Sequence, residues 1–157
     1  HLTFSTLHTN DTPSAITRLY MLGVEPFLIA NATNLVMAQR LVRTLCNDCK
    51  RPDENVDPDM LEFCGFTEEE IETGTIYGPV GCDNCVDGFK GRQCITEALV
   101  MSPEIRRIIL ESTDRIDEEL IRKKAIENGM VTLRESGKHR VLQHTTTIDE
   151  VIAATVE

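Results

Sequence analysis

The fold of this chain is decided by two matched cysteine pairs, Cys46-Asn-Asp-Cys49 and Cys82-Asp-Asn-Cys85. Two residues between cysteines allow a tight turn that points both sulfur atoms at one ion, and two such turns complete a tetrahedron. The 32 residues between Cys49 and Cys82 make a longer loop than a common zinc ribbon has. Loop closure still costs little extra, because its entropy grows only with the logarithm of length. The sequence therefore predicts a metal module over residues 46–94, with zinc as the ion.

Other uses of these cysteines stay open. Iron suits four thiolates as well, a pair of disulfides would require an oxidising compartment, and one pair could be a redox-active dithiol. Four protein thiolates leave a zinc ion no open position, so the zinc is expected to be structural. The two remaining cysteines, Cys64 and Cys94, are interpreted as small buried hydrophobic residues.

The negative charge of the chain is concentrated between the cysteine pairs. Residues 52–85 contain ten acidic residues and no Lys or Arg, whereas the rest of the chain carries 16 acids and 16 bases. A zinc ribbon that binds nucleic acid is ordinarily basic, and base stacking needs aromatic residues, which make up only 4% of this chain. A zinc-ribbon module that binds nucleic acid or protein remains the second hypothesis. The acidic segment is a candidate docking surface for basic partner segments.

Regular elements are expected on both sides of the module. Before it, alternation predicts a strand over residues 2–7, and Thr12-Pro13 predicts a helix capped by Thr12 and stopped by Gly23. A second helix is predicted from Glu25-Pro26 to about Ala32, and a strand in the later part of residues 35–45. No apolar run approaches the roughly 18 residues that a membrane span needs.

After the module a strand over residues 91–100 and a helical tail are expected. Ser102-Pro103 and Asp114 are predicted to open two helices. The capping boxes Thr132-x-x-Glu135 and Thr147-x-x-Glu150 predict two closing helices. Within the module itself, a short helix is predicted near residues 67–71.

The histidine at the end of the first predicted strand is a candidate ligand-binding residue. His8 lies where a strand gives way to a helix, which is where parallel α/β sheets bind ligands and where backbone N–H groups favour phosphate. A lone loop histidine is a weak signal. His139 and His144 are interpreted as surface residues.

These stretches together resemble one family. Residues 2–11 with the Arg18-Leu19 helix and Gly23–Ala30 resemble the histidine box of the secretion ATPase superfamily, whose members drive type II secretion and type IV pilus assembly. Residues 36–49 resemble the strand that enters the family's tetracysteine module, and residues 88–97 its exit. Residues 129–137 and 146–151 resemble the family's C-terminal end, so the resemblance covers essentially the whole chain. The tetracysteine insert points to the secretion or pilus-extension branch rather than to the retraction motors.

The resemblance implies an α/β fold. The expected architecture is the C-terminal fragment of a RecA-like P-loop ATPase domain with an inserted tetracysteine zinc module and an all-helical C-terminal tail. In this division, residues 1–45 belong to the ATPase core, residues 46–94 form the zinc module, and residues 95–157 form the return strand and helical subdomain.

The resemblance also implies a set of site residues and partners. His8 would face the γ-phosphate of ATP as a sensor or transition-state contact, and Arg18 and Arg40 would face phosphate or a neighbouring subunit. Cys46, Cys49, Cys82 and Cys85 would hold Zn²⁺. The chain lacks a Gly-x-x-x-x-Gly-Lys-Ser/Thr phosphate loop, so the fragment alone is not expected to hydrolyse ATP with Mg²⁺. The expected assembly is a homohexamer in the bacterial cytoplasm that is held at the inner membrane by a platform protein and binds no nucleic acid.

Overall fold

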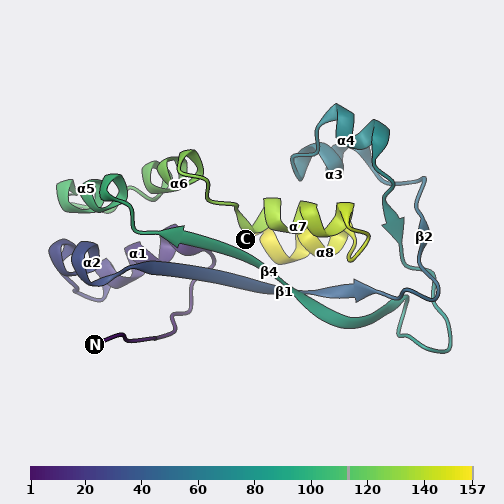
Figure 1. Cartoon of the computed structure of the whole chain (residues 1–157), viewed down its shortest axis with the longest axis horizontal. Coiled ribbons are helices and arrows are strands. Elements are labelled where there is room, and N and C mark those ends of the chain that lie inside the picture. The colour runs from purple at the N-terminus through teal and green to yellow at the C-terminus, as the bar shows by residue number, and fades with distance from the viewer. Residues whose placement is uncertain (113, 157) are drawn as a thin grey trace. The chain divides into compact units, whose positions relative to one another are not determined.

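The computed structural model describes residues 1–112 and 114–156, and these form a mixed α/β structure (Figure 1). The elements, in chain order, are α1 (Thr12–Met21), α2 (Pro26–Ala32), β1 (Leu35–Leu45), β2 (Arg51–Pro52), α3 (Pro58–Phe63), α4 (Glu68–Thr73), β3 (Tyr77–Gly78), β4 (Phe89–Val100), α5 (Pro103–Glu111), α6 (Glu118–Glu127), α7 (Leu133–Leu142) and α8 (Ile148–Thr155).

The chain divides into two compact units. Residues 1–38 and 97–132 form the first, here called the helical unit, and residues 39–96 and 133–157 form the second, here called the cysteine unit. Strands β1 and β4 pair in a two-stranded sheet, and their arrows run in opposite directions in Figure 1. Each strand belongs to both units, because β1 crosses the division after Ala38 and β4 crosses it before Glu97. The helical tail expected over residues 95–157 is therefore shared between the two units rather than forming one of its own.

The helical unit is built on an apolar core. Helix α2 packs on α5, α1 packs on α6, and α5 packs on α6. The isoleucines of α5 show why: Ile105 and Ile109 are fully buried and lie one helical turn apart, so they fall on one face of the helix. The buried core residues are Ile16, Ile29, Ala30, Leu99, Met101, Ile105, Ile109, Ile116, Ile121 and Ala125.

The start of α1 differs from the predicted one. Asp11, not Thr12, is the N-cap: its Oδ1 accepts from the Ser14 backbone N–H at 2.9 Å, and the Ser14 hydroxyl accepts from the Asp11 N–H at 3.3 Å. Thr12 is the first helical residue and Pro13 the second. Both Thr12 and Asp11 satisfy the rule that a short polar side chain caps a helix, so sequence alone cannot choose between them.

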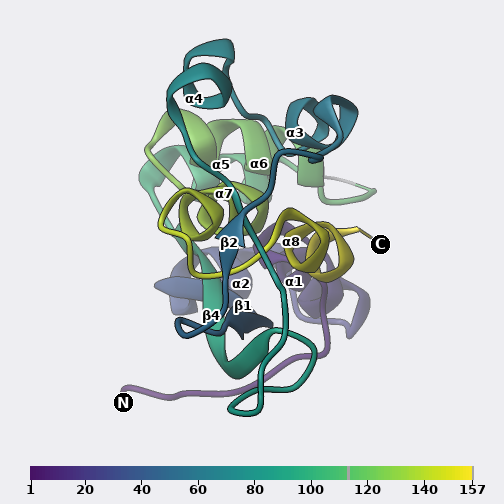
Figure 2. The same cartoon turned by 90° about the vertical axis from the view of Figure 1, so that its right-hand side faces the viewer.

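The buried apolar cluster of the cysteine unit is smaller than that of the helical unit, although Val42, Leu45 and Ile95 are also buried outside it. Helices α7 and α8 lie side by side (Figures 1 and 2), and α3 and α4 come from the segment between the cysteine pairs. The two-residue strands β2 and β3 pair antiparallel, with Arg51 opposite Gly78 and Pro52 opposite Tyr77. Its buried cluster consists of Leu61, Cys64, Phe66, Val141, Ile148 and Val151.

The strand predicted over residues 2–7 is absent. Residues 1–9 have no regular secondary structure, and the side chains of Leu2 and Phe4 are 79% and 87% exposed. A strand needs a neighbour for its backbone N–H and C=O groups, and the two sheets of the described residues contain only β1 with β4 and β2 with β3. The alternating pattern alone does not supply that neighbour.

Three further details, two of them in the tail, differ from the predictions. The helix expected to open at Asp114 begins at Glu118, with Asp117 as its N-cap. At α8 the hydroxyl of Thr147 does accept from the Glu150 N–H, but the Glu150 carboxylate accepts from Arg43. Helix α3, in the segment between the cysteine pairs, was not predicted, because it spans only six residues and is too short for a helical period to stand out.

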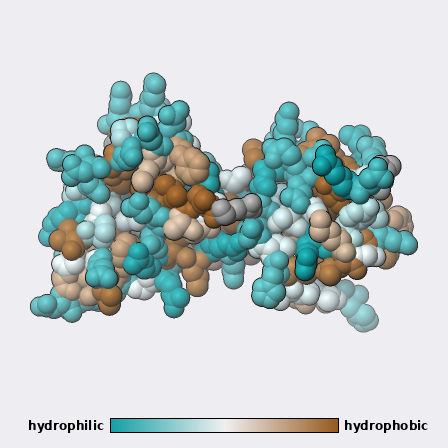
Figure 3. All heavy atoms as spheres, turned by 180° about the vertical axis from the view of Figure 1, so that it is seen from behind, coloured by the Kyte–Doolittle hydropathy of each residue, from teal (hydrophilic) through white to brown (hydrophobic). Residues whose placement is uncertain are grey.

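The surface and the helices were also compared with what a membrane protein requires. The face of the molecule seen in Figure 3 shows apolar side chains interspersed with hydrophilic ones. Among the described residues, no helix combines the length and apolar character required to cross a membrane.

Candidate metal centre and histidine pocket

The four cysteines of the two matched pairs come together at one point of the cysteine unit. Their Sγ atoms all lie within 4.8 Å of one another. The Sγ–Sγ distances are 3.9 Å between Cys46 and Cys82, 3.7 Å between Cys49 and Cys85, and 3.6 Å between Cys82 and Cys85. A tetrahedral ion with zinc–sulfur bonds of about 2.3 Å requires sulfur atoms about 3.8 Å apart. The cluster therefore fits a structural zinc ion.

Backbone hydrogen bonds build each cysteine pair into a turn. The amides of Cys49 and Lys50 donate to the Cys46 carbonyl at 3.3 and 2.9 Å, and the Cys85 amide donates to the Cys82 carbonyl at 3.2 Å. Two further amides donate to sulfur: Gly81 to Cys49 at 3.4 Å and Cys82 to Cys85 at 3.2 Å. Amide donors of this kind stabilise a thiolate, which is the form that binds metal.

The two turns differ in exposure and are joined at three places. Cys46 and Cys49 are buried, Cys85 is half-buried and Cys82 is exposed. Strand β2 follows the first turn, strand β3 precedes the second, and the two strands pair with each other. The Cys46 amide also donates to the Gly88 carbonyl at 2.8 Å. Asn84 Nδ2 also donates to Asp48 Oδ2 at 3.3 Å. The buried turn at Cys46–Cys49 thus holds the more exposed turn at Cys82–Cys85 in place through these contacts.

Protonation is unevenly shared in the second turn. The Asn84 backbone N–H lowers the pKa of Cys82, but hydrogen bonds with the neighbouring thiols and desolvation raise it to about 12 overall. For Cys85, desolvation raises the pKa, and hydrogen bonds from backbone N–H groups and neighbouring thiols outweigh it and lower the pKa overall. Among the four thiols, Cys85 therefore loses its proton before Cys82 does.

Gly88 fixes the approach of the second turn. It has φ +82°, and a Cβ placed there would lie 2.4 Å from Pro79 Cβ and 2.8 Å from the Val80 backbone nitrogen. Only glycine adopts this conformation without strain and leaves room for the segment opposite. The close approach of Gly88 to residues 79–80 is not visible in the sequence, because it depends on how the chain folds back on itself.

The turn between α7 and α8 supports the strand that enters the cluster. The Leu45 amide donates to the Thr145 carbonyl at 2.8 Å, and Lys50 Nζ donates to the His144 carbonyl at 2.7 Å. His144 has φ +56°, a left-handed conformation, and its ring lies 4.3 Å from that of Tyr77. His144 was predicted to be a surface residue; it is half-buried instead, because its neighbours are far away in sequence.

A buried lysine links the acidic segment to α7. Lys138 is 6% exposed, and its Nζ lies 3.2 Å from Glu70 Oε2 and 3.1 Å from Glu135 Oε1. It also donates to the Gly65 carbonyl at 3.1 Å. Desolvation lowers the pKa of Lys138, but the two carboxylates outweigh it and raise the pKa overall. The acidic segment, which has no Lys or Arg of its own, thus pairs with a lysine of α7. Nothing in the sequence singles out this lysine.

The remaining cysteines lie outside the cluster. Cys64 is buried, as predicted, and desolvation raises its pKa. Cys94 was predicted to be buried but is half-buried, with its Sγ 3.6 Å from the Gln39 side-chain oxygen. All six cysteines are free thiols in the structure.

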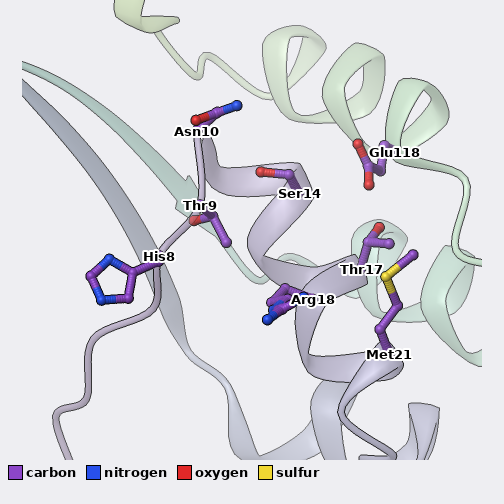
Figure 4. Close-up of a pocket in the computed structure, with 8 residues that line it drawn as sticks. All are labelled: His8, Thr9, Asn10, Ser14, Thr17, Arg18, Met21 and Glu118. Atoms are coloured by element: carbon purple, nitrogen blue, oxygen red, sulfur yellow. The ribbon is translucent and has the colours of Figure 1, made fainter. Parts of the chain in front are cut away.

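The predicted phosphate-binding residues are placed in two different regions. His8 and Arg18 line one open pocket of about 270 Å³ in the helical unit, drawn in Figure 4. Arg40 lies on β1 in the cysteine unit and is not among the residues that line this pocket. The full lining is His8, Thr9, Asn10, Ser14, Thr17, Arg18, Met21 and Glu118.

The pocket is open, and most of the residues that line it have polar side chains. Figure 4 shows His8 on the loop that leads into α1, Arg18 on that helix, and Glu118 on the opposite wall. His8 and Arg18 are exposed, whereas the Thr17 Oγ1 atom is buried without a hydrogen-bond partner among the described residues. An imidazole, a guanidinium and several hydroxyls suit an anionic ligand such as phosphate.

Comparison with known proteins supports the family resemblance of the sequence along nearly the whole chain. Residues 1–153 match the family described as type II/IV secretion system protein. The chain is 40% identical to the type IV pilus assembly ATPase PilB of Myxococcus xanthus and 45% identical to that of Thermus thermophilus, over 99% and 100% of its length. It is 41% identical to the type II secretion system protein E of Pectobacterium carotovorum over 100% of its length.

The match covers only part of each relative. The chain spans 27% of the Myxococcus protein, 17% of the Thermus protein and 30% of the Pectobacterium protein. This chain belongs to the type II/IV secretion system protein family, as its match over residues 1–153 shows.

Proposed function

We propose that this member of the type II/IV secretion system protein family is the C-terminal region of a hexameric ATPase motor that powers type IV pilus assembly or type II protein secretion. One observation carries the proposal: the whole chain aligns at 40–45% identity with proteins named as type IV pilus assembly ATPases. In this proposal residues 1–45 belong to a RecA-like core, and the catalytic machinery for ATP and Mg²⁺ is completed by residues outside these 157.

His8 is proposed to contact the γ-phosphate of ATP as a sensor or transition-state contact. His8 and Arg18 line the same pocket, and this supports the role, because a cation and an imidazole together stabilise developing negative charge on a phosphoryl group. Arg40 is proposed to contact phosphate or a neighbouring subunit from its own place on β1. The 157 residues contain no phosphate-loop motif, so they are not expected to hydrolyse ATP alone.

Zinc is proposed as a structural cofactor held by Cys46, Cys49, Cys82 and Cys85. A zinc ion in this cluster would cross-link two turns that are 36 residues apart in sequence. With four protein thiolates around it, the ion would offer no position to a substrate. The amides of Gly81 and Cys82 would orient and stabilise the thiolates that hold it.

The proposed partners follow from the same motor function. The assembled hexamer would work in the bacterial cytoplasm at the inner membrane, bound to a platform protein of the pilus or secretion machine. The acidic segment, residues 52–85, gives no support to nucleic-acid binding.

The first experiment is the substitution His8→Ala in the full-length protein. ATP turnover is expected to fall at least tenfold, since a lost transition-state contact commonly costs about 10- to 1000-fold in kcat. His139→Ala is the matched control, because His139 is an exposed histidine on α7. Unchanged turnover in His8→Ala would remove the phosphate role.

A second experiment tests the metal. Elemental analysis of protein purified without an affinity-metal column is expected to give about one zinc per chain, with four thiols released on chelation. Thiols oxidised in pairs, without metal, would contradict the proposed cofactor.

A further inference from the structure

Glu97 is a buried carboxylate that the proposed function does not use. It lies on β4 and is 2% exposed, between the fully buried side chains of Ile95 and Leu99 on the same strand face. Burying a carboxylate costs free energy unless strong hydrogen bonds replace its water. An apolar residue at this position would avoid that cost. The carboxylate therefore calls for a reason beyond filling the core.

Its strongest contacts go to the first residue of α1. Glu97 Oε1 accepts from the Thr12 backbone N–H at 2.9 Å and from the Thr12 hydroxyl at 2.5 Å. The two residues are 85 positions apart in sequence. The Thr12 hydroxyl is not needed to cap the helix, because Asp11 and Ser14 already form a complete capping box. Glu97 thus accepts hydrogen bonds from both the backbone and the side chain of Thr12, a residue that does not cap the helix.

A second long-range contact holds the residue just before it. Arg122 of α6 donates to Asp11 Oδ2 at 2.6 Å, and the side chains of Arg122 and Asp11 are 30% and 14% exposed. Arg122 is also attracted electrostatically to Glu97. Two neighbouring residues, Asp11 and Thr12, are thus fixed by side chains of a helix and a strand that lie 111 and 85 residues away in the sequence.

The residues so fixed end the loop that carries His8. Residues 8–10 line the pocket, and Asp11 follows directly after them. Residues 1–9 have no regular secondary structure, so neither a helix nor a strand of the described residues holds His8 in place. The contacts of Asp11 and Thr12 therefore anchor the end of the loop that carries His8.

We propose that Glu97 and Arg122 are positioning residues for His8: they fix Asp11 and Thr12, and so hold the His8 loop in the place where the imidazole meets phosphate. The inference rests on the proposed phosphate role of His8 and adds the residues that make it effective. A catalytic group held in one geometry does not have to be ordered during the reaction, and a misplacement of about 1 Å can cost on the order of 100-fold in rate.

The test compares variants of the full-length protein by ATP turnover. Glu97→Gln and Thr12→Val are each expected to lower kcat about tenfold, with the KM for ATP within about twofold of the wild type. Thr12→Ser keeps the hydroxyl and is expected to retain most of the activity. Glu111→Gln, which changes an exposed carboxylate at the end of α5, is the matched control and is expected to have no effect.

A double-mutant cycle separates positioning from general support of the fold. If Glu97 acts through His8, the double variant His8→Ala/Glu97→Gln should turn over ATP no more slowly than His8→Ala alone. Multiplied losses in the double variant, or full activity in Glu97→Gln, would overturn the inference. Full activity in His8→Ala would instead refute the phosphate role itself.

Thr12 keeps the inference testable if Glu97→Gln does not fold. Thr12→Val replaces the hydroxyl that bonds to Glu97 by a methyl group, whereas Thr12→Ser keeps that hydroxyl and loses a methyl group, so the comparison needs no change of the buried carboxylate. Equal kcat in these two variants would contradict the inference. A lower kcat in Thr12→Val, absent from the His8→Ala background, would support it.

Discussion

The helical unit and the cysteine unit are stabilised in different ways. The helical unit buries ten core residues, and the isoleucines Ile16, Ile105, Ile109 and Ile121 are fully buried. The cysteine unit buries a cluster of six, one of them a cysteine, and further apolar side chains outside that cluster, among them Val42, Leu45 and Ile95. It relies in addition on four converging thiols, on the ion pairs of Lys138, and on hydrogen bonds from the α7–α8 turn.

The difference shows how stability depends on composition. Apolar burial is spread over many contacts, so each residue contributes a limited share. A metal cluster concentrates much of the stability in four atoms, because the free energy of metal binding becomes free energy of folding. The acidic segment has few apolar residues, and the proposed zinc ion would compensate for the small core that it builds. Substitutions should therefore affect the two units independently and to different degrees.

The largest effect is expected from loss of a metal ligand. Cys46→Ser in the full-length protein should abolish zinc binding, which contributes on the order of 10 kcal/mol. Hydrogen–deuterium exchange should then show lost protection over residues 39–96, with protection of α5 and α6 retained. Cys94→Ser is the control, since Cys94 lies outside the cluster, and it should keep about one zinc per chain. Full zinc content in Cys46→Ser would contradict the four-thiolate site.

The converse substitution lies in the core of the helical unit. Ile105→Ala removes a fully buried side chain and should lower the local free energy of unfolding by about 2–5 kcal/mol. Exchange protection should fall in α2 and α5, while zinc content stays unchanged. Ile126→Ala, at a residue 47% exposed, should cost less than about 0.5 kcal/mol. Loss of zinc in Ile105→Ala would show that the two units are not independent.

Gly88→Ala tests the geometry of the exposed turn without removing a thiol. The added Cβ meets backbone atoms at 2.8 Å in a left-handed conformation, so we expect a cost of about 2–3 kcal/mol and weaker zinc binding. Gly91→Ala is the matched control, because Gly91 has φ +84° but nothing within 4 Å of the new atom. Its cost should be limited to backbone strain, about 1 kcal/mol. Equal zinc affinities in the two variants would mean that the close approach to Pro79 and Val80 is unimportant.

Lys138→Met should give the smallest effect, and one that depends on pH. Losing the ammonium group leaves the Glu70 carboxylate with the Thr67 N–H as its remaining hydrogen-bond donor and removes the Lys138 hydrogen bond to the Gly65 carbonyl, at a cost of about 1–2 kcal/mol. The Thr67 backbone N–H, together with Lys138, holds the pKa of Glu70 below its usual value of 4.5. The stability from this group is therefore present above pH 4.5 or so and is lost as pH falls through the lowered pKa.

The measurement is the exchange protection factor of residues 65–74 at neutral and at acidic pH. Wild type should lose protection on acidification, and Lys138→Met should lose less, because part of the stabilisation is already gone. Lys124, which pairs with Glu127, is the control, because its side chain is more exposed than that of Lys138. Lys124→Met should change stability by only about 0–0.5 kcal/mol. An unchanged pH dependence in Lys138→Met would mean that the ion pair does not stabilise the acidic segment.

Much of the fold could be predicted from local signals. Pro26 after Glu25, Ser102 before Pro103, and Thr67 three residues before Glu70 all mark helix starts that the structure contains. These predictions succeeded because capping and proline effects act within a few residues. The strand predicted over residues 2–7 failed because strand formation depends on a neighbour, which no local pattern guarantees.

The same distinction applies to the sites. The spacing of Cys46, Cys49, Cys82 and Cys85 indicated one cluster, and the four thiols do lie together. Glu97 and Lys138 could not be recognised, because a buried and an exposed charged residue look the same in a sequence. Only the packing of distant elements around them makes these two charges buried.

The cysteine cluster, several helix starts marked by local caps, and the resemblance to a secretion ATPase could all be predicted from the sequence alone. Each of these depends on residues at fixed, short spacings, where chemistry and backbone geometry leave few alternatives. Tertiary structure alone decided the division into two units, the grip of Glu97 on Thr12 across 85 positions, and the use of Glu150 to hold Arg43. Such contacts join residues whose separation is set by the whole fold, so no local rule of capping, periodicity or spacing contains them.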